Sequence, residues 1–149
     1  NIALVFMGYG PLTGMIKSKS VNTNIFHYPA VPPHVLLDYT SSADIGLCLI
    51  EDTCLSYKYC LPNKMFEYMM AGLPVVGLNL VEIAKVIENC GIGVTMSKNT
   101  TEELNRAISE INAMPQHTLS KNLLKASEKY CWEVQEIELQ ALYSELCAL

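Results

Sequence analysis

Short apolar runs alternate with segments of helical periodicity along the whole chain. Apolar runs bounded by turn residues are typical of buried strands, and they predict strands at Ile2–Phe6, Asn24–Tyr28, Ile45–Ile50, Val75–Leu78 and Gly93–Met96. Apolar positions at helical spacing predict helices at Pro11–Lys19, His34–Ser42, from Pro62 to a stop at Gly72, Val81–Asn89, Thr101–Met114, Leu119–Tyr130 and Trp132–Leu149. This alternation indicates an α/β fold in which helices cover both faces of a parallel sheet.

Proline, glycine and capping residues refine several of these boundaries. Pro62 suits the first position of a helix, where its missing N–H is no loss. Gly91 is expected to stop the helix before it. Thr100 or Thr101 is expected to cap the next helix, and Glu103 adds the character of a capping box. The polar segment Glu51–Cys60 is expected to be a loop. The final helix carries a wide apolar stripe, formed by Val134, Ile137, Leu139, Ala141, Leu142 and Leu146.

The helix that starts near Pro62 has the strongest candidate chemistry. Lys64 and Glu67 lie one turn apart and are neighbours on the helix surface. A lysine at the positive end of a helix dipole is repelled by that end. An anion bound there makes the position of the lysine favourable. A carboxylate one turn further can accept two hydrogen bonds from a vicinal diol such as ribose. The alternative is an exposed Lys64–Glu67 ion pair worth under about 1 kcal/mol.

A glycine turn follows the first predicted strand. Gly8 and Gly10 stand between that strand and a helix that begins with Pro11, an arrangement similar to a phosphate-binding loop. A nicotinamide or flavin site fits poorly, because the third glycine, Gly14, comes one residue late and no acidic residue precedes Asp38. The two glycines also suit a tight strand-to-helix turn without a ligand. In parallel sheets ligands bind beyond the carboxyl ends of the strands, so the loops there are expected to gather at one edge.

Composition excludes several classes of protein. The chain has 149 residues, which suits one domain, and half of them are hydrophobic, which excludes global disorder. The net charge of −5 and the lack of a Lys/Arg cluster argue against nucleic acid as a partner. Six cysteines without metal or redox spacing favour a reducing, cytoplasmic compartment. No apolar run is long enough to span a membrane, and no signal peptide is visible.

The histidines do not define a site. His27 and His34 flank a Pro-rich loop, where either a structural or a catalytic role is open, and His117 is far from both in sequence. No metal-ligating set is evident, so no metal is expected. The chain begins directly on a strand-like run without an initiator Met, which predicts that it is a piece of a longer protein.

The run LPNKMFEYMMAGLPVV at Leu61–Val76 resembles the donor-site segment of nucleotide-sugar glycosyltransferases of the GT-B architecture. The group that it resembles includes glycogen synthases and bacterial capsule and lipopolysaccharide glycosyltransferases. Further similar stretches follow the same order along the chain, at Leu4–Leu12, Tyr39–Asp44, Gly91–Gly93 and Trp132–Leu146. The resemblance implies a Rossmann-like parallel sheet flanked by helices, forming the C-terminal half of such an enzyme, with an extra C-terminal helix.

The resemblance assigns roles position by position. Glu67 matches the glutamate that holds the donor ribose, and the backbone around Lys64 matches the helix start that faces the donor diphosphate, so both are candidate catalytic residues. The loop that contains Ala30 and Val31 matches the stretch that meets the nucleobase. The residues implied in substrate binding are Gly8, Gly10, Ala30, Val31, Pro62, Asn63, Lys64 and Glu67.

One departure concerns the donor sugar. The family has a second glutamate before the ribose-binding one, with seven residues between the two, and Tyr59 stands at that place here. The usual contact to the sugar hydroxyls, and with it the identity of the sugar, is therefore not given by the resemblance. The strand and helix that carry further phosphate ligands in the family, and the acceptor-binding half, are not in this chain.

The resemblance thus implies one nucleotide-sugar-binding domain over residues 1–149, whose terminal helix at 131–149 packs toward an N-terminal domain of the same parent. The parent is expected to move a hexose from a UDP- or GDP-sugar to a saccharide or lipid-linked acceptor, with retention and without a metal or other cofactor. Its expected location is the cytoplasm or the inner face of the cell membrane. This chain alone is expected to be inactive. A nucleotide-sugar epimerase, a phosphorylase-like enzyme and a non-catalytic interaction module stay open as alternatives.

Overall fold

The computed structural model describes residues 2–147 of the chain. Its residues fall into two compact units, unit 1 (Asn1–Leu36) and unit 2 (Leu37–Leu149). The short helical turn η1 (Pro33–Val35) and helix α2 (Leu36–Thr40) carry the chain from the first unit to the second. Each unit has its own parallel sheet.

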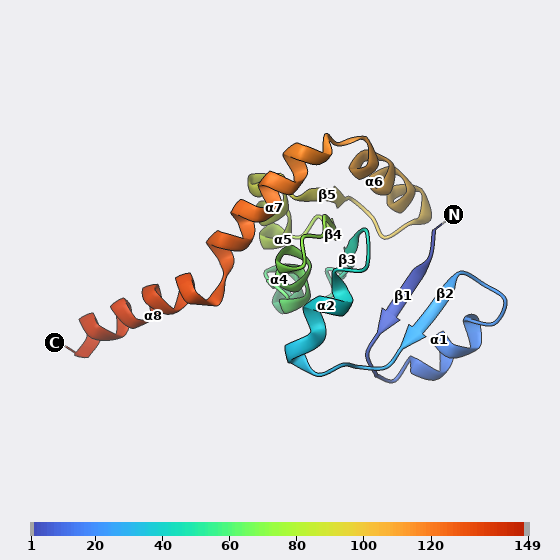
Figure 1. Cartoon of the computed structure of the whole chain (residues 1–149), viewed down its shortest axis with the longest axis horizontal. Coiled ribbons are helices and arrows are strands. Elements are labelled where there is room, and N and C mark those ends of the chain that lie inside the picture. Colours follow the sequence, from blue (N-terminus) through green and yellow to red (C-terminus); the bar gives the residue numbers. More distant parts are fainter. Residues whose placement is uncertain (1, 148–149) are drawn as a thin grey trace. The chain divides into compact units, whose positions relative to one another are not determined.

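Unit 1 is a βαβ unit. Strands β1 (Leu4–Met7) and β2 (Ile25–Tyr28) pair in parallel, with Leu4 opposite Ile25 and Met7 opposite Tyr28. Helix α1 (Thr13–Lys19) connects them and packs on β2 (Figure 1). Parallel neighbours need a crossover connection of this kind, because a tight turn reverses the chain.

Unit 2 has a three-stranded parallel sheet in the order β3 (Gly46–Cys48), β4 (Val75–Leu78) and β5 (Gly93–Met96). Every residue of the central strand β4 is buried, as expected of a strand covered on both faces. The helices of this unit are α3 (Leu55–Lys58), α4 (Asn63–Met70), α5 (Val81–Cys90), α6 (Thr101–Ala113), α7 (Gln116–Tyr130) and α8 (Trp132–Cys147) (Figure 1). The predicted α/β class, with helices flanking parallel strands and an extra C-terminal helix, is confirmed.

The hydrophobic core of unit 2 lies between β4 and the helices that pack on the sheet. Helices α4 and α5 contact β4, and both also contact α7. The largest fully buried side chains come from the three strands, from α4 and α5, and from the turn between α5 and β5. They are Met65, Met69, Ile83, Ile87, Ile92, Met96, Val75, Val76 and Cys48. Gly91 ends α5 in the left-handed conformation, with φ of 60°, so the predicted stop is confirmed.

Three sequence predictions of local structure are wrong in detail. The segment Glu51–Cys60 is not all loop, because it contains the single-turn helix α3. The helix expected over His34–Ser42 is a 3₁₀ turn followed by a short α-helix. Pro62 is the N-cap of α4 rather than its first helical residue, since its backbone is extended at ψ 143°.

The last helix, α8, follows α7 and contacts it (Figure 1). Its apolar residues are distributed around the helix rather than along one stripe, and none of its described residues is buried. The prediction of a helix from Trp132 is confirmed as far as Cys147, and the predicted positions Ala148 and Leu149 lie outside the described residues.

Candidate functional site

The start of α4 leaves backbone donors without a side-chain cap among residues 2–147. Pro62 precedes the helix, and its carbonyl accepts the first helical hydrogen bond, from the N–H of Met65 at 3.0 Å. In the described part of the chain no side chain caps this start. The first N–H groups of a helix have no partner within the helix, and they form the positive end of its dipole. An anion placed here would therefore meet backbone donors and a favourable field.

Packing contacts on its other faces fix the rotation of α4 about its own axis. Met65 and Met69 are 0% and 1% exposed and anchor the helix in the core. The ring of Phe66 lies against the ring of Tyr130 on α7, with 5.8 Å between their centroids. These contacts use the apolar positions, and they leave Lys64 and Glu67 half-buried and Asn63 exposed.

Tyr68 joins α4 to strand β3. Its hydroxyl donates to the carbonyl of Leu47 at 3.4 Å, and its ring lies directly over Gly46. A Cβ at Gly46 would collide with the Tyr68 ring, so glycine here lets the helix approach the strand closely. Burial raises the pKa of Tyr68. The helix start is thereby held close to β3.

Lys64 lies near the carboxyl end of β3. Burial raises the pKa of the thiol of Cys48, the last residue of that strand, to about 11, and the positive charge of Lys64 acts in the opposite direction. The ammonium group is therefore close to the edge of the sheet where ligands of parallel α/β proteins bind. Among residues 2–147 neither Lys64 nor Glu67 has a side-chain hydrogen bond or an ion-pair partner, so the Lys64–Glu67 ion pair considered as an alternative is not formed.

The glycine turn of unit 1 borders an open hollow of about 290 Å³ at the carboxyl end of β1. Gly8 has φ of 138°, a value that favours glycine, and its N–H donates to the carbonyl of Tyr28 at 3.0 Å. The N–H of Gly10 donates to Oγ1 of Thr13 at 2.9 Å. Nothing lies within 4 Å of a Cβ built at either glycine, so the space beside the turn is free.

His27 supports this turn from the neighbouring strand. Its Nε2 is 3.0 Å from the carbonyl oxygen of Gly8, and the side chain is half-buried. Of the two roles left open by the sequence, this contact favours the structural one.

The predicted substrate-binding residues fall in two groups. Helix α4 and its N-cap bring together Pro62, Asn63, Lys64 and Glu67. In unit 1, Gly8 and Gly10 line the hollow, while the exposed Ala30 and half-buried Val31 follow the end of β2. The assignment of these residues to a donor stays a prediction.

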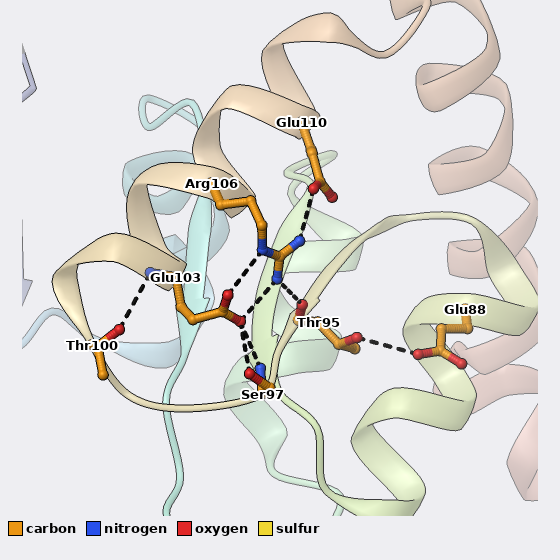
Figure 2. A network of polar contacts seen from close by, with 7 residues as sticks. All are labelled: Glu88, Thr95, Ser97, Thr100, Glu103, Arg106 and Glu110. Carbon is orange, nitrogen blue, oxygen red and sulfur yellow. Dashed lines mark hydrogen bonds and ion pairs between the residues drawn. The ribbon is translucent and has the colours of Figure 1, made fainter.

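A polar network that the sequence did not reveal lies at the carboxyl end of β5 (Figure 2). Arg106 on α6 donates to the carbonyl of Thr95 at 2.9 Å and forms ion pairs with Glu103 and Glu110 at 3.1 and 2.8 Å. Glu103 also accepts from the N–H and the hydroxyl of Ser97, at 2.9 and 3.0 Å. The network ties the first turns of α6 to the strand end.

Only half of the predicted capping box is present. Oγ1 of Thr100 accepts from the N–H of Glu103 at 3.3 Å, as expected (Figure 2). The Glu103 carboxylate, however, binds Ser97 and Arg106, and the N–H of Thr100 donates to the carbonyl of Lys98. The reciprocal bond is lost because the guanidinium is the stronger donor.

This network predicts a loss of stability in acid. The hydrogen bond from Arg106, with those from Ser97, lowers the pKa of Glu103 from 4.5 to about 2. A lowered pKa in the folded state gives a stabilisation that is complete above pH 4.5 and is lost as the pH falls toward about 2. We expect the wild type to lose more stability than Glu103→Gln over this range, measured by urea unfolding at several pH values.

Glu102→Gln is the matched control, because Glu102 lies in the same helical turn and its side chain has no hydrogen bond among residues 2–147. If both variants show the same dependence of stability on pH, the network does not account for the acid sensitivity.

Residues 2–147 contain no grouping of three His, Cys, Asp or Glu side chains that could hold a metal ion. Within the same residues, no helix combines the length and the apolar character needed to cross a membrane.

Comparison with known proteins places the chain in a family. The family described as glucosyltransferase 3-like, C-terminal domain, matches residues 6–131. Among curated protein sequences none matches the chain. Among solved structures, the chain is similar to sucrose-phosphate synthase from Thermosynechococcus elongatus, with a TM-score of 0.74 and 21% identity over 97% of this chain. That similarity is one of fold, and the chain spans 38% of the length of that protein. Since the family match covers most of the sequence, the chain belongs to the family of glucosyltransferase 3-like C-terminal domains.

Proposed function

We propose that this chain is the donor-binding domain of a glycosyltransferase that moves a hexose from a UDP- or GDP-sugar to a saccharide or lipid-linked acceptor. The observation that supports this most is the uncapped start of α4, where Lys64 and Glu67 have no hydrogen-bond or ion-pair partner among residues 2–147. Lys64 is close to the edge where parallel α/β folds bind ligands, and Glu67 lies one helical turn further along α4. The family description, which names a glucosyltransferase, fits a hexose donor.

The chemistry in this proposal is electrostatic. As the bond between sugar and diphosphate breaks, negative charge builds on the departing phosphate oxygens. The first N–H groups of α4 and the ammonium of Lys64 would stabilise that charge without changing their positions during the reaction. Glu67 would accept hydrogen bonds from the two ribose hydroxyls and hold the nucleotide in register. This scheme requires no metal or cofactor, and by family analogy the anomeric configuration is retained.

Unit 1 carries predicted donor contacts of its own. Gly8 and Gly10 would offer a turn without side chains, and the backbone at Ala30 and Val31 would meet the nucleobase. Tyr59 is 56% exposed at the end of α3 and stands where the family has a glutamate. The donor sugar hydroxyls would therefore be bound by groups other than a carboxylate at this position.

The parent protein would supply the acceptor site in an N-terminal domain, and the terminal helix at residues 131–149 would pack toward it. The exposed apolar side chains of α8, among them Trp132 and Ile137, support this assignment because they lack cover in unit 2. We place the parent in the cytoplasm or at the inner face of the cell membrane, where nucleotide sugars are made and used.

Titration of the chain with UDP, GDP and NAD, followed by NMR, tests the proposal directly. We expect UDP or GDP to shift the amide signals of residues 63–67, and NAD to leave them unchanged. Binding of none of the three would favour a non-catalytic interaction module, and selective binding of NAD would favour a dinucleotide enzyme.

Replacement of Lys64 by alanine is expected to weaken binding of UDP or GDP about tenfold, because it removes one charge-assisted contact to the diphosphate. Stability should change by less than about 0.5 kcal/mol, since Lys64 has no ion-pair partner among residues 2–147. Calorimetric titration and urea unfolding measure the two quantities separately. Lys125→Ala, on the exposed side of α7, is the control. Equal nucleotide affinity in wild type and Lys64→Ala would remove Lys64 from the site.

A further inference from the structure

A side-chain hydrogen bond links the two outer loops at the carboxyl edge of the sheet in unit 2. Nδ2 of Asn99 donates to Oε1 of Glu51 at 2.9 Å, although the two residues are 48 apart in sequence. Glu51 follows β3 and Asn99 follows β5, and β4 lies between these strands. The bond therefore bridges the edge of the sheet across the end of the central strand.

The loop on the Asn99 side is held firmly. Ser97 donates two hydrogen bonds to Glu103, and Arg106 binds both Glu103 and the end of β5 (Figure 2). On the other side of Asn99, the hydroxyl of Thr100 caps α6. Asn99 is thus presented from a short loop whose two ends are fixed by hydrogen bonds.

The segment on the Glu51 side packs against the core only at its end, where Cys60 is half-buried. None of residues 51–60 is buried, and Leu55, Tyr57 and Tyr59 are 74%, 50% and 56% exposed. Its regular structure is limited to the one turn of α3, together with a hydrogen bond from the N–H of Thr53 to the carbonyl of Glu51 at 2.9 Å. This segment leads directly into Pro62 and the start of α4. A contact that fixes its first residue therefore limits the conformations of the whole segment.

We infer that Asn99 and Glu51 are positioning residues of the donor site. Their hydrogen bond holds segment 51–60, and with it Tyr59, in place beside the open start of α4. Neither residue is required to touch the nucleotide sugar. The inference rests on the proposed function for its link to donor binding, whereas the ordering of the segment is a property of the protein itself.

Exchanging the hydrogen-bond donor and the hydrogen-bond acceptor between positions 51 and 99 tests the bond. Asn99→Asp places two carboxylates opposite each other and should open segment 51–60, so that its amides exchange hydrogen about fivefold faster, the factor expected for loss of one ordinary hydrogen bond. Glu51→Gln keeps an acceptor oxygen and should exchange like the wild type. The double variant Glu51→Gln/Asn99→Asp restores a bond of opposite direction and should recover slow exchange. A merely structural loss at residue 99 would not be rescued by a change at residue 51.

Nucleotide affinity is measured by calorimetry with UDP and GDP on the same four proteins. We expect Asn99→Asp to weaken affinity about threefold to fivefold, and the double variant to recover it. Asn105→Asp, which adds the same charge at an exposed position of α6, should match the wild type in both measurements. Equal exchange in wild type and Asn99→Asp, or no recovery in the double variant, would overturn the inference. A wild type that binds neither nucleotide would overturn the proposed function, and the exchange rates would still decide whether the bond orders the segment.

Discussion

Replacement of Glu67 by alanine in the complete enzyme is expected to lower kcat/KM for the nucleotide sugar at least about tenfold. The loss of a hydrogen bond between a charged carboxylate and a diol costs about 1.5–3 kcal/mol, which corresponds to this factor or more. Glu67 is half-buried on α4 and has no side-chain hydrogen bond or ion pair among residues 2–147, so its removal breaks no polar contact of the fold. Steady-state kinetics with varied donor concentration measure the effect.

Two further variants make this result specific. Glu67→Gln keeps the volume and one acceptor oxygen, so we expect a smaller loss than with alanine. Glu128→Ala removes an exposed carboxylate from α7 and should leave kcat/KM unchanged. If Glu67→Ala folds normally and turns over like the wild type, Glu67 does not bind the donor.

The sequence predicted the elements of unit 2 best where burial is complete. Strand β4 reads as an uninterrupted apolar run, and the structure buries all of it. Helix α5 has both a clear periodicity and a glycine that can adopt the left-handed stop. Helix α3 was missed because one turn is too short to establish a period. In α8, apolar residues occupy positions all around the helix, so the stripe written from the sequence does not correspond to one face.

In the candidate site, too, the sequence predicted some contacts and not others. Lys64 and Glu67 were predictable as neighbours because helical spacing fixes their relation within α4. The bond between Glu51 and Asn99 was not, because its partners are 48 residues apart and meet only through the order of the strands. Glu103 carried a sequence signal for capping, but its carboxylate is bound instead by Ser97, which lies before the helix, and by Arg106, one turn further along α6. Local spacing thus predicts contacts within one element, whereas contacts between loops depend on strand order.

Replacement of Gly46 by alanine is expected to lower the free energy of unfolding by about 3 kcal/mol, the upper part of the range for overpacking in a core. A methyl group at this position of β3 would collide with the ring and Cβ of Tyr68, which cannot move without displacing α4 from the strand. Because α4 carries Lys64 and Glu67, the folded fraction of the variant should also bind UDP or GDP more weakly. Urea unfolding and calorimetric titration measure the two effects.

The coupling between Gly46 and Tyr68 identifies the cause. In a Tyr68→Ala background the ring is absent, so Gly46→Ala should cost clearly less than in the wild type, and a double-mutant cycle gives the difference. Gly14→Ala is the contrasting variant: it lies in α1 with no atom near the new methyl group and should gain about 0.5–1 kcal/mol from helix propensity. An equal cost of Gly46→Ala in both backgrounds would mean that close approach of α4 to β3 does not position the helix, and the start of α4 would then need another anchor to hold a diphosphate at the edge of the sheet.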